Sequence, residues 1–168
     1  MMTNPEPALS VELTEDSGSI EFPSGLIGLT EWKRFVLMRH PDGDPLCLLQ
    51  SLEDTRLSFV LADPRQIIPD YQISLSQADL QALQLLDYNG RKDWLEEGIL
   101  NPYCILSVQE EPFLVTANLL GPLLVNGKAG IGRQIILSNL GYETRYTLYP
   151  AEDLPVALRL SEEGKEQS

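Results

Sequence analysis

The sequence is poor in the residues that build disulfide frameworks, zinc sites and many catalytic centres. Its 168 residues include two cysteines, Cys47 and Cys104, and one histidine, His40. The two cysteines are too few and too far apart for a disulfide framework or a cysteine-rich zinc site, and both lie in apolar runs, which predicts buried free thiols. A Ser-His-Asp triad would have to use His40, which lies in the turn-like stretch RHPDGDP, and the sequence contains no G-x-S-x-G.

Positive charge and long apolar runs are also scarce. Twelve Lys and Arg residues stand against 25 Asp and Glu residues, which gives a formal net charge of −13. Such a charge repels a phosphate backbone and favours basic partners, so it argues against direct nucleic-acid binding. No stretch approaches the roughly 18 apolar residues that span a membrane, and the N-terminus lacks the basic and apolar segments of a signal peptide. We therefore expect no membrane partner and a cytoplasmic location.

The sequence does contain a series of short apolar or alternating runs, separated by Pro, Gly, Asp and Asn, which is typical of a meandering antiparallel sheet. The candidate strands cover residues 10–14, 18–22, 33–38, 46–51, 57–62, 102–109, 113–119, 122–126, 133–138 and 143–149. We expect a mainly β, antiparallel single domain, barrel-like or sandwich-like, because one open sheet would expose an apolar face. This domain is predicted over residues 10–160, with a flexible tail at residues 1–9 and a flexible acidic tail at residues 161–168.

One stretch, SQADLQALQLL, departs from the strand pattern and predicts a short helix near residues 76–86. Ser76 and Asp79 have the spacing of a capping box, in which side chains satisfy the free amide groups at the start of a helix. Leu80, Leu83 and Leu86 recur at helical spacing and would form the apolar face. We expect this helix to lie on the sheet.

Another stretch, VNGKAGIGRQIIL at residues 125–137, looks like a phosphate-binding loop but lacks two required residues. The pattern G-x-x-x-x-G-K-[ST] needs a hydroxyl residue after the lysine, where this chain has Ala129. It also needs a glycine five residues before Gly127, where this chain has Pro122. We predict instead a hairpin loop between a strand ending at Asn126 and one starting near Arg133.

Neighbouring acids occur at Glu53 and Asp54 and again at Glu110 and Glu111. Adjacent residues of a strand point to opposite faces, so these pairs do not preassemble a carboxylate dyad for acid–base chemistry. An acidic, mainly β module with many edges and loops is typical of proteins that bind other chains. The alternative is a small-ligand-binding β-barrel, or a cryptic enzyme with an acid cluster around residues 53–54 and 63.

Several segments, in order and at compatible spacing, point to a known family. They are Ile20-Glu21-Phe22 with Gly25-Leu26-Ile27-Gly28, Leu49-Gln50-Ser51 with Glu53-Asp54, Pro69-Asp70-Tyr71, Thr116-Ala117-Asn118-Leu119-Leu120, and Gly132-Arg133-Gln134. Together they resemble the FliW family of flagellar assembly factors, from about residue 18 to residue 149. The resemblance implies a compact, barrel-like antiparallel β protein without catalytic activity, and no cofactor is expected.

The resemblance also implies two protein partners. Proteins of this kind bind flagellin in the cytoplasm, and they bind the carbon storage regulator, a small RNA-binding dimer that blocks flagellin translation. We selected candidate contact residues on their charge and expected exposure. They are Glu53, Asp54, Asp70, Tyr71, Glu110 and Glu111. In contrast, Asn118, Asn126 and Gln134 are expected to satisfy buried backbone groups.

Overall fold

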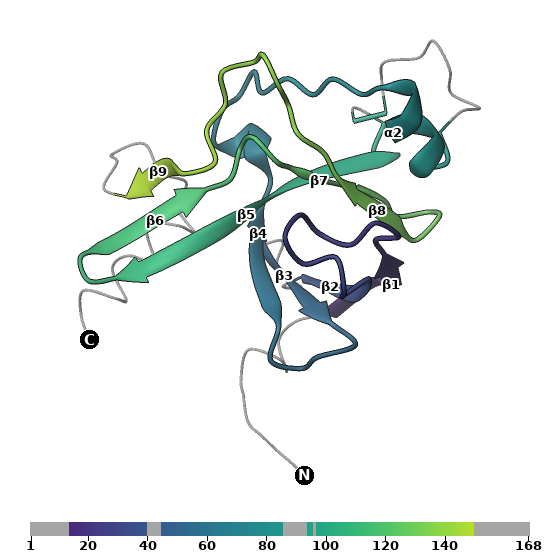
Figure 1. The fold of residues 1–168 in the computed structure, drawn as a ribbon, viewed down its shortest axis with the longest axis horizontal. Coiled ribbons are helices and arrows are strands. Elements are labelled where there is room, and N and C mark those ends of the chain that lie inside the picture. Colours follow the sequence, from purple (N-terminus) through teal and green to yellow (C-terminus); the bar gives the residue numbers. More distant parts are fainter. Residues whose placement is uncertain (1–13, 40–44, 86–93, 96, 150–168) are drawn as a thin grey trace.

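The computed structural model describes residues 14–39, 45–85, 94–95 and 97–149 (Figure 1). The tails predicted at residues 1–9 and 161–168 lie outside the described residues, as does most of the strand predicted at residues 10–14. The described elements, in chain order, are β1 (Thr14–Glu21), β2 (Arg34–Arg39), β3 (Leu46–Ser51), β4 (Ser58–Ala62), η1 (Pro64–Gln66), α2 (Gln77–Ala82), β5 (Leu100–Glu110), β6 (Phe113–Ala117), β7 (Leu123–Asn126), β8 (Ile131–Gln134) and β9 (Tyr146–Tyr149).

The sheet closes into a barrel. Its strands follow the order β4-β3-β2-β1-β8-β7-β5, and β5 then pairs back onto β4 through Val60 with Leu106 and Ala62 with Cys104. Strands β6 and β9 extend the sheet beyond this ring, because the second half of the long strand β5 pairs with β6. Figure 1 shows the β5–β6 hairpin projecting to one side of the barrel. The sequence was compatible with a barrel or a sandwich, and the structure is a barrel.

Two apolar cores lie on either side of the barrel wall. The inner core fills the barrel and consists of Ile20, Phe22, Leu26, Phe35, Leu37, Cys47, Leu49, Leu61, Tyr103, Leu123 and Val125. The outer core lies between the wall and the segments that cover it, and includes Ala62, Tyr71, Leu80, Leu83, Leu85, Cys104, Leu106, Leu119, Leu124, Ile135, Leu137 and Leu148. All four residues of β7 are buried, because alternate side chains enter the two cores.

The two cysteines are buried free thiols, as the sequence predicts. Cys47 belongs to the inner core and Cys104 to the outer core. Burial raises the pKa of the Cys104 thiol to about 12, so this side chain is an unreactive apolar residue at neutral pH.

The predicted strands are largely confirmed, but among the described strands only the one predicted at 46–51 has its observed ends. The strand predicted at 18–22 begins earlier, at Thr14, and three others differ clearly at one or both ends. The strand predicted at 133–138 runs from Ile131 to Gln134, and the one predicted at 143–149 begins at Tyr146. The strand predicted at 113–119 ends at Ala117. For the strands predicted at 113–119 and 133–138, the apolar run continues past the ladder, because Leu119, Ile135 and Leu137 fill the outer core from extended segments that lie outside any strand.

The predicted helix and its capping box are confirmed, but the helix is shorter than residues 76–86. The Ser76 Oγ accepts a hydrogen bond from the Asp79 amide, and the Asp79 carboxylate accepts one from the Ser76 amide. The helix α2 ends at Ala82, since Gln84 has a φ of +60° and leaves the helical region. Leu80 and Leu83 are buried as the apolar stripe predicts, while Leu86 lies outside the described residues.

The stretch that resembled a phosphate-binding loop is a hairpin turn between β7 and β8, as predicted. Gly130 has a φ of +67°, and its amide donates to the Asn126 carbonyl at 2.9 Å. The Asn126 Oδ1 accepts a hydrogen bond from the Ala129 amide at 3.3 Å. The turn is followed by strand β8 and not by the helix that a nucleotide loop requires.

Candidate partner-binding surfaces

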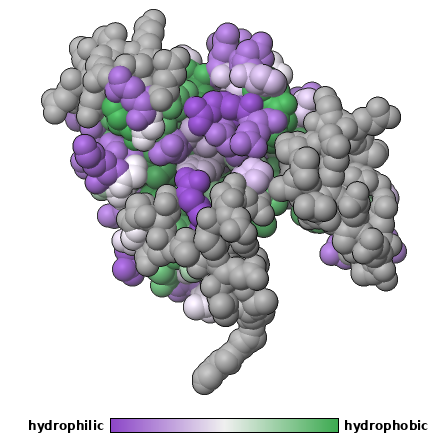
Figure 2. Space-filling model, turned by 180° about the vertical axis from the view of Figure 1, so that it is seen from behind, coloured by the Kyte–Doolittle hydropathy of each residue, from purple (hydrophilic) through white to green (hydrophobic). Residues whose placement is uncertain are grey.

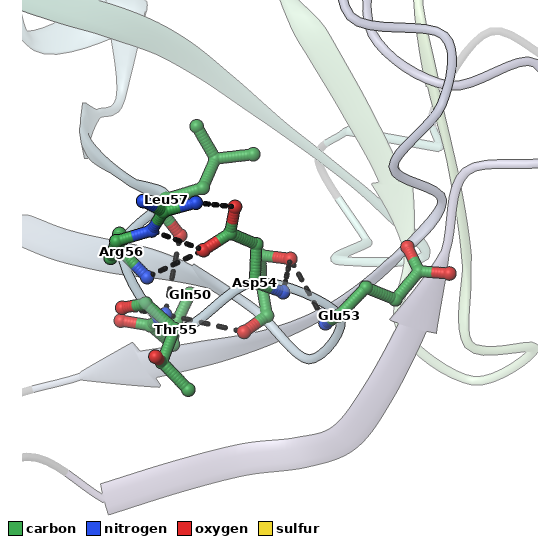
Figure 3. Close-up of polar contacts among 7 residues, drawn as sticks. Gln50, Glu53, Asp54, Thr55, Arg56 and Leu57 are labelled. Carbon is green, nitrogen blue, oxygen red and sulfur yellow. Dashed lines mark hydrogen bonds and ion pairs between the residues drawn. The ribbon is translucent and has the colours of Figure 1, made fainter.

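The turn between β3 and β4 carries two of the candidate acids and is held by its own side chains (Figure 3). The buried Ser51 hydroxyl accepts hydrogen bonds from the amides of Glu53 and Asp54, both at 3.0 Å. The Gln50 carboxamide donates to the carbonyls of Thr55 and Leu57 on the other side of the turn. Residues 50–57 therefore form a preorganised loop that presents its acids in one arrangement.

The two acids of this turn point apart and have different partners. The Glu53 carboxylate accepts a hydrogen bond from the Lys33 amide at 2.7 Å and one from the Arg34 amide at 3.3 Å, and these bonds lower its pKa. The Asp54 carboxylate accepts two bonds from the Arg56 guanidinium and one from its amide, which lower the pKa of Asp54. Figure 3 shows Glu53 directed away from the Asp54–Arg56 pair, so the two carboxylates do not form a dyad.

The other acidic candidates lie elsewhere on the surface. Asp70 is exposed on the segment between η1 and α2, and Glu110 and Glu111 are exposed at the β5–β6 hairpin. Figure 1 places these two segments and the β3–β4 turn at three separate parts of the molecule. The structure thus brings together the acids that are neighbours in the sequence, but it does not join all five into one patch.

Tyr71 is not the exposed residue that the sequence led us to expect. Its side chain is 7% exposed, its hydroxyl donates a hydrogen bond to the Leu119 carbonyl, and its ring packs on Tyr142 with 4.5 Å between centroids. Burial raises the pKa of this phenol, which keeps it protonated as a donor. The expectation of exposure is therefore wrong, because the covering segment turns this ring inward to the outer core.

The acids considered for a cryptic enzyme do not form one cluster. Asp54 precedes β4 and Asp63 follows it, so the whole extended length of this five-residue strand separates them. The Asp63 carboxylate caps η1 and accepts two hydrogen bonds from the Arg65 guanidinium. Within the described ranges, no three His, Cys, Asp or Glu side chains are grouped to hold a metal ion. In the same residues, no helix is long and apolar enough to cross a membrane.

Three buried or half-buried amides satisfy backbone groups, as the sequence predicts. Asn118 Oδ1 accepts from the Gly121 amide, and Asn126 Nδ2 donates to the Leu83 carbonyl. The Gln134 Nε2 donates to the Gly121 carbonyl at 2.8 Å, while its Oε1 accepts from the Ile27 amide at 2.8 Å. These side chains fix three loops against the barrel, which gives them a structural role.

A groove of about 460 Å³ lies between residues 74–79 and 133–138, and no sequence pattern predicted it. Leu75 and Ile136 supply apolar side chains, and Ser74, Ser76 and Ser138 supply hydroxyl groups. The two walls are 54 residues apart at the ion pair that joins Arg133 to Asp79, so no local pattern could indicate the groove. Figure 2 shows the molecule from behind. On this face, the surface of the described residues is mainly hydrophilic, with smaller hydrophobic areas between.

The ion pair between Arg133 and Asp79 anchors β8 to the start of α2. Its Nε to Oδ1 distance is 2.8 Å, and both side chains are partly buried. Burial alone would raise the pKa of Asp79, but hydrogen bonds from the Ser76 amide and the Arg133 guanidinium together outweigh it, so that the pKa is lowered below 3.8. The ionised form of Asp79 therefore stabilises the folded chain.

We expect the variant Asp79→Asn to be less stable than the wild type by about 1–2 kcal/mol at pH 7, because the Arg133 guanidinium loses its charged acceptor. A lowered folded pKa gives stability that is present above the unfolded pKa and is lost as the pH falls through the folded pKa. The difference between the two proteins should thus shrink below about pH 4. Urea unfolding at several pH values measures it, with the exposed Asp70→Asn as control; a difference that stays constant with pH would contradict the assignment.

These observations first define a class: a small closed-barrel protein whose interior is filled by side chains and whose candidate binding features all lie on its outer surface. Comparison with known sequences then identifies the family, since the family described as "FliW protein" matches residues 7–148. The chain belongs to the FliW family of flagellar assembly factors. This is not a family of enzymes.

Individual relatives agree with this assignment. Flagellar assembly factor FliW of Natranaerobius thermophilus is 35% identical over 83% of this chain and 86% of its own length. That of Desulfitobacterium hafniense is 36% identical over 84% of this chain and 86% of its own length. A solved structure, described as the crystal structure of the flagellar assembly factor FliW, superposes with a TM-score of 0.65 at 33% identity, covering 82% of this chain and 89% of that one.

Proposed function

We propose that this protein binds flagellin in the cytoplasm and antagonises the carbon storage regulator, and thereby controls flagellin translation. Membership of the FliW family is the observation that carries this proposal. The protein acts by binding and not by catalysis. When secretion removes flagellin, the freed protein binds the regulator, so that flagellin supply feeds back on its own translation.

The distribution of charge supports the regulator as a partner. The chain has a net charge of −13, and Glu53, Asp54, Asp70, Glu110 and Glu111 all lie at turns, hairpins or connecting segments of the fold. An RNA-binding protein carries a basic surface, and an acidic surface both attracts such a partner and orients it. The β3–β4 turn is held rigidly, because hydrogen bonds to the Ser51 hydroxyl fix its backbone and the amides of residues 33–34 fix the Glu53 carboxylate.

Mutual exclusion of the two partners provides the regulatory step. If flagellin and the regulator weaken each other's binding, by overlap or by coupling through the barrel, then each does so by the same factor. An excess of flagellin is therefore expected to release the regulator from this protein. The protein needs no catalytic residue for this role.

The test is a sizing-column experiment with purified flagellin and carbon storage regulator from the same organism. We expect each to co-elute with this protein at micromolar concentration, and flagellin added in excess to displace the regulator. The regulator complex should also weaken as salt is raised, since it depends on charge. If neither protein co-elutes, the proposed function is wrong; if both remain bound together at full affinity, the exclusion mechanism is wrong.

A further inference from the structure

Residues 135–137 continue from β8 as an extended segment. One edge of this segment is hydrogen-bonded to residues 120–122, and the backbone groups of its other edge are free of bonds to the described residues. On the paired side, the Ile135 amide donates to the Pro122 carbonyl at 3.1 Å and the Leu137 amide donates to the Leu120 carbonyl at 2.9 Å. Because successive residues of an extended chain direct their backbone groups to opposite edges, the N–H and C=O of Ile136 point away from residues 120–122. Within the described part of the chain, no hydrogen bond is made to these two groups.

The groove runs along this free edge. Residues 133–138 line it without a break, and the extended residues 74–76 form part of the opposite wall. The backbone groups of Ser74 and Leu75 also make no hydrogen bond to a described residue. A strand-like segment placed in the groove would find unpaired donors and acceptors on both sides, which is the requirement for strand addition.

Two exposed apolar side chains belong to this region. Ile136 is 51% exposed, and Ile27 is 57% exposed. The Gln134 side chain bridges the Ile27 amide and the Gly121 carbonyl, and a Cβ at Gly121 would meet the Ile136 side chain at 3.5 Å, so this side chain lies near the paired segment while the Ile136 backbone groups point away from it. Two exposed isoleucines fixed on an ordered scaffold offer an apolar contact beside the free backbone groups.

The groove is electrically neutral in a strongly acidic protein. Among the described residues that line it, the charged side chains are Asp79 and Arg133, which neutralise each other in an ion pair, and the uncharged polar ones are three serines and Gln134. Charge complementarity therefore favours an uncharged segment, in contrast to the basic partner favoured by the acidic turns.

We propose that the groove binds an uncharged, extended segment of flagellin, which adds as a strand to the free edge at Ile136 and places an apolar side chain between Leu75 and Ile136. This assignment rests on the proposed function, since it takes flagellin as the occupant. It also places flagellin and the basic regulator on different surfaces, so that their mutual exclusion acts through the barrel and not by direct overlap.

The test uses the full-length protein and purified flagellin, with Ile136→Asp as the variant and Val108→Asp as its matched control. Val108 is 55% exposed on the β5–β6 hairpin, so the two substitutions add the same charge at similar exposure. We expect Ile136→Asp to weaken flagellin binding at least tenfold, about 1.4 kcal/mol, and Val108→Asp to change it less than twofold. Hydrogen exchange should show the Ile136 amide unprotected in the free protein and protected in the complex.

Three results would overturn the proposal that flagellin binds in the groove. If the wild type binds flagellin and Ile136→Asp binds it equally well, the groove is not the site, and the proposed function stands. An Ile136 amide that is already protected in the free protein would mean that another segment of this chain occupies the edge. If the wild type does not bind flagellin, the proposed function fails together with this assignment.

Discussion

Replacement of Phe35 by alanine is expected to lower the free energy of unfolding by about 3–5 kcal/mol, the range found when a buried phenylalanine is truncated. The Phe35 side chain is fully buried in the inner core. Its ring contacts Phe22 edge-on at 5.7 Å between centroids and Phe59 at 6.3 Å. The closed barrel wall limits how far these neighbours can move inward, so most of the cavity should remain.

Thermal and urea unfolding measure this loss. At about 2–4 °C per kcal/mol for a chain of this size, the melting temperature should fall by roughly 6–20 °C. The milder variant Phe35→Leu should lose distinctly less, and the exposed Val108→Ala should change stability by less than about 0.5 kcal/mol. If Phe35→Ala were as stable as Val108→Ala, the inner core would not be the packed interior that the structure shows.

The features that the sequence predicted correctly depend on residues close together in the chain. The capping box joins Ser76 to Asp79, three positions along the chain, and the turn joins Asn126 to Gly130, four positions along. Strand β3 was predicted with its observed ends, since its apolar run is bounded by a proline and by the turn that Ser51 holds. In each case the stabilising contact lies within the segment itself, so one sequence is enough to predict it.

The features that the sequence did not predict depend on contacts between distant segments. Barrel closure rests on the pairing of Val60 with Leu106, which no local pattern encodes. The burial of Tyr71 depends on Leu119, and the groove depends on two segments that are distant in the sequence and are joined by the ion pair of Asp79 and Arg133. The acidic candidates at turns were predicted as exposed because charge alone places them at the surface, whereas an aromatic side chain such as Tyr71 fits either environment.

Gly132 is a further position whose requirement comes from a distant residue, and its replacement by valine is expected to cost about 3 kcal/mol. A Cβ at this position would lie 2.6 Å from two ring atoms of Phe22, which no side chain can tolerate without movement. The Phe22 ring is fully buried and held against Phe35, so it has no free space to enter. Overpacking of this kind costs roughly 1–3 kcal/mol, and the two added methyl groups of valine should place the loss at the upper end.

A matched glycine in the same hairpin separates this steric effect from the general effect of losing a glycine. Nothing lies within 4 Å of a Cβ built on Gly127, so Gly127→Ala should be neutral or stabilising by up to about 1 kcal/mol. Valine is otherwise favourable in a strand, so any loss in Gly132→Val comes from the contact with Phe22. The smaller side chain in Phe22→Leu should therefore make Gly132→Val less costly, by about 0.5 kcal/mol or more in a double-mutant cycle. Equal melting temperatures for Gly132→Val and Gly127→Ala, or strict additivity in the cycle, would show that the barrel is not closed against β8 as described.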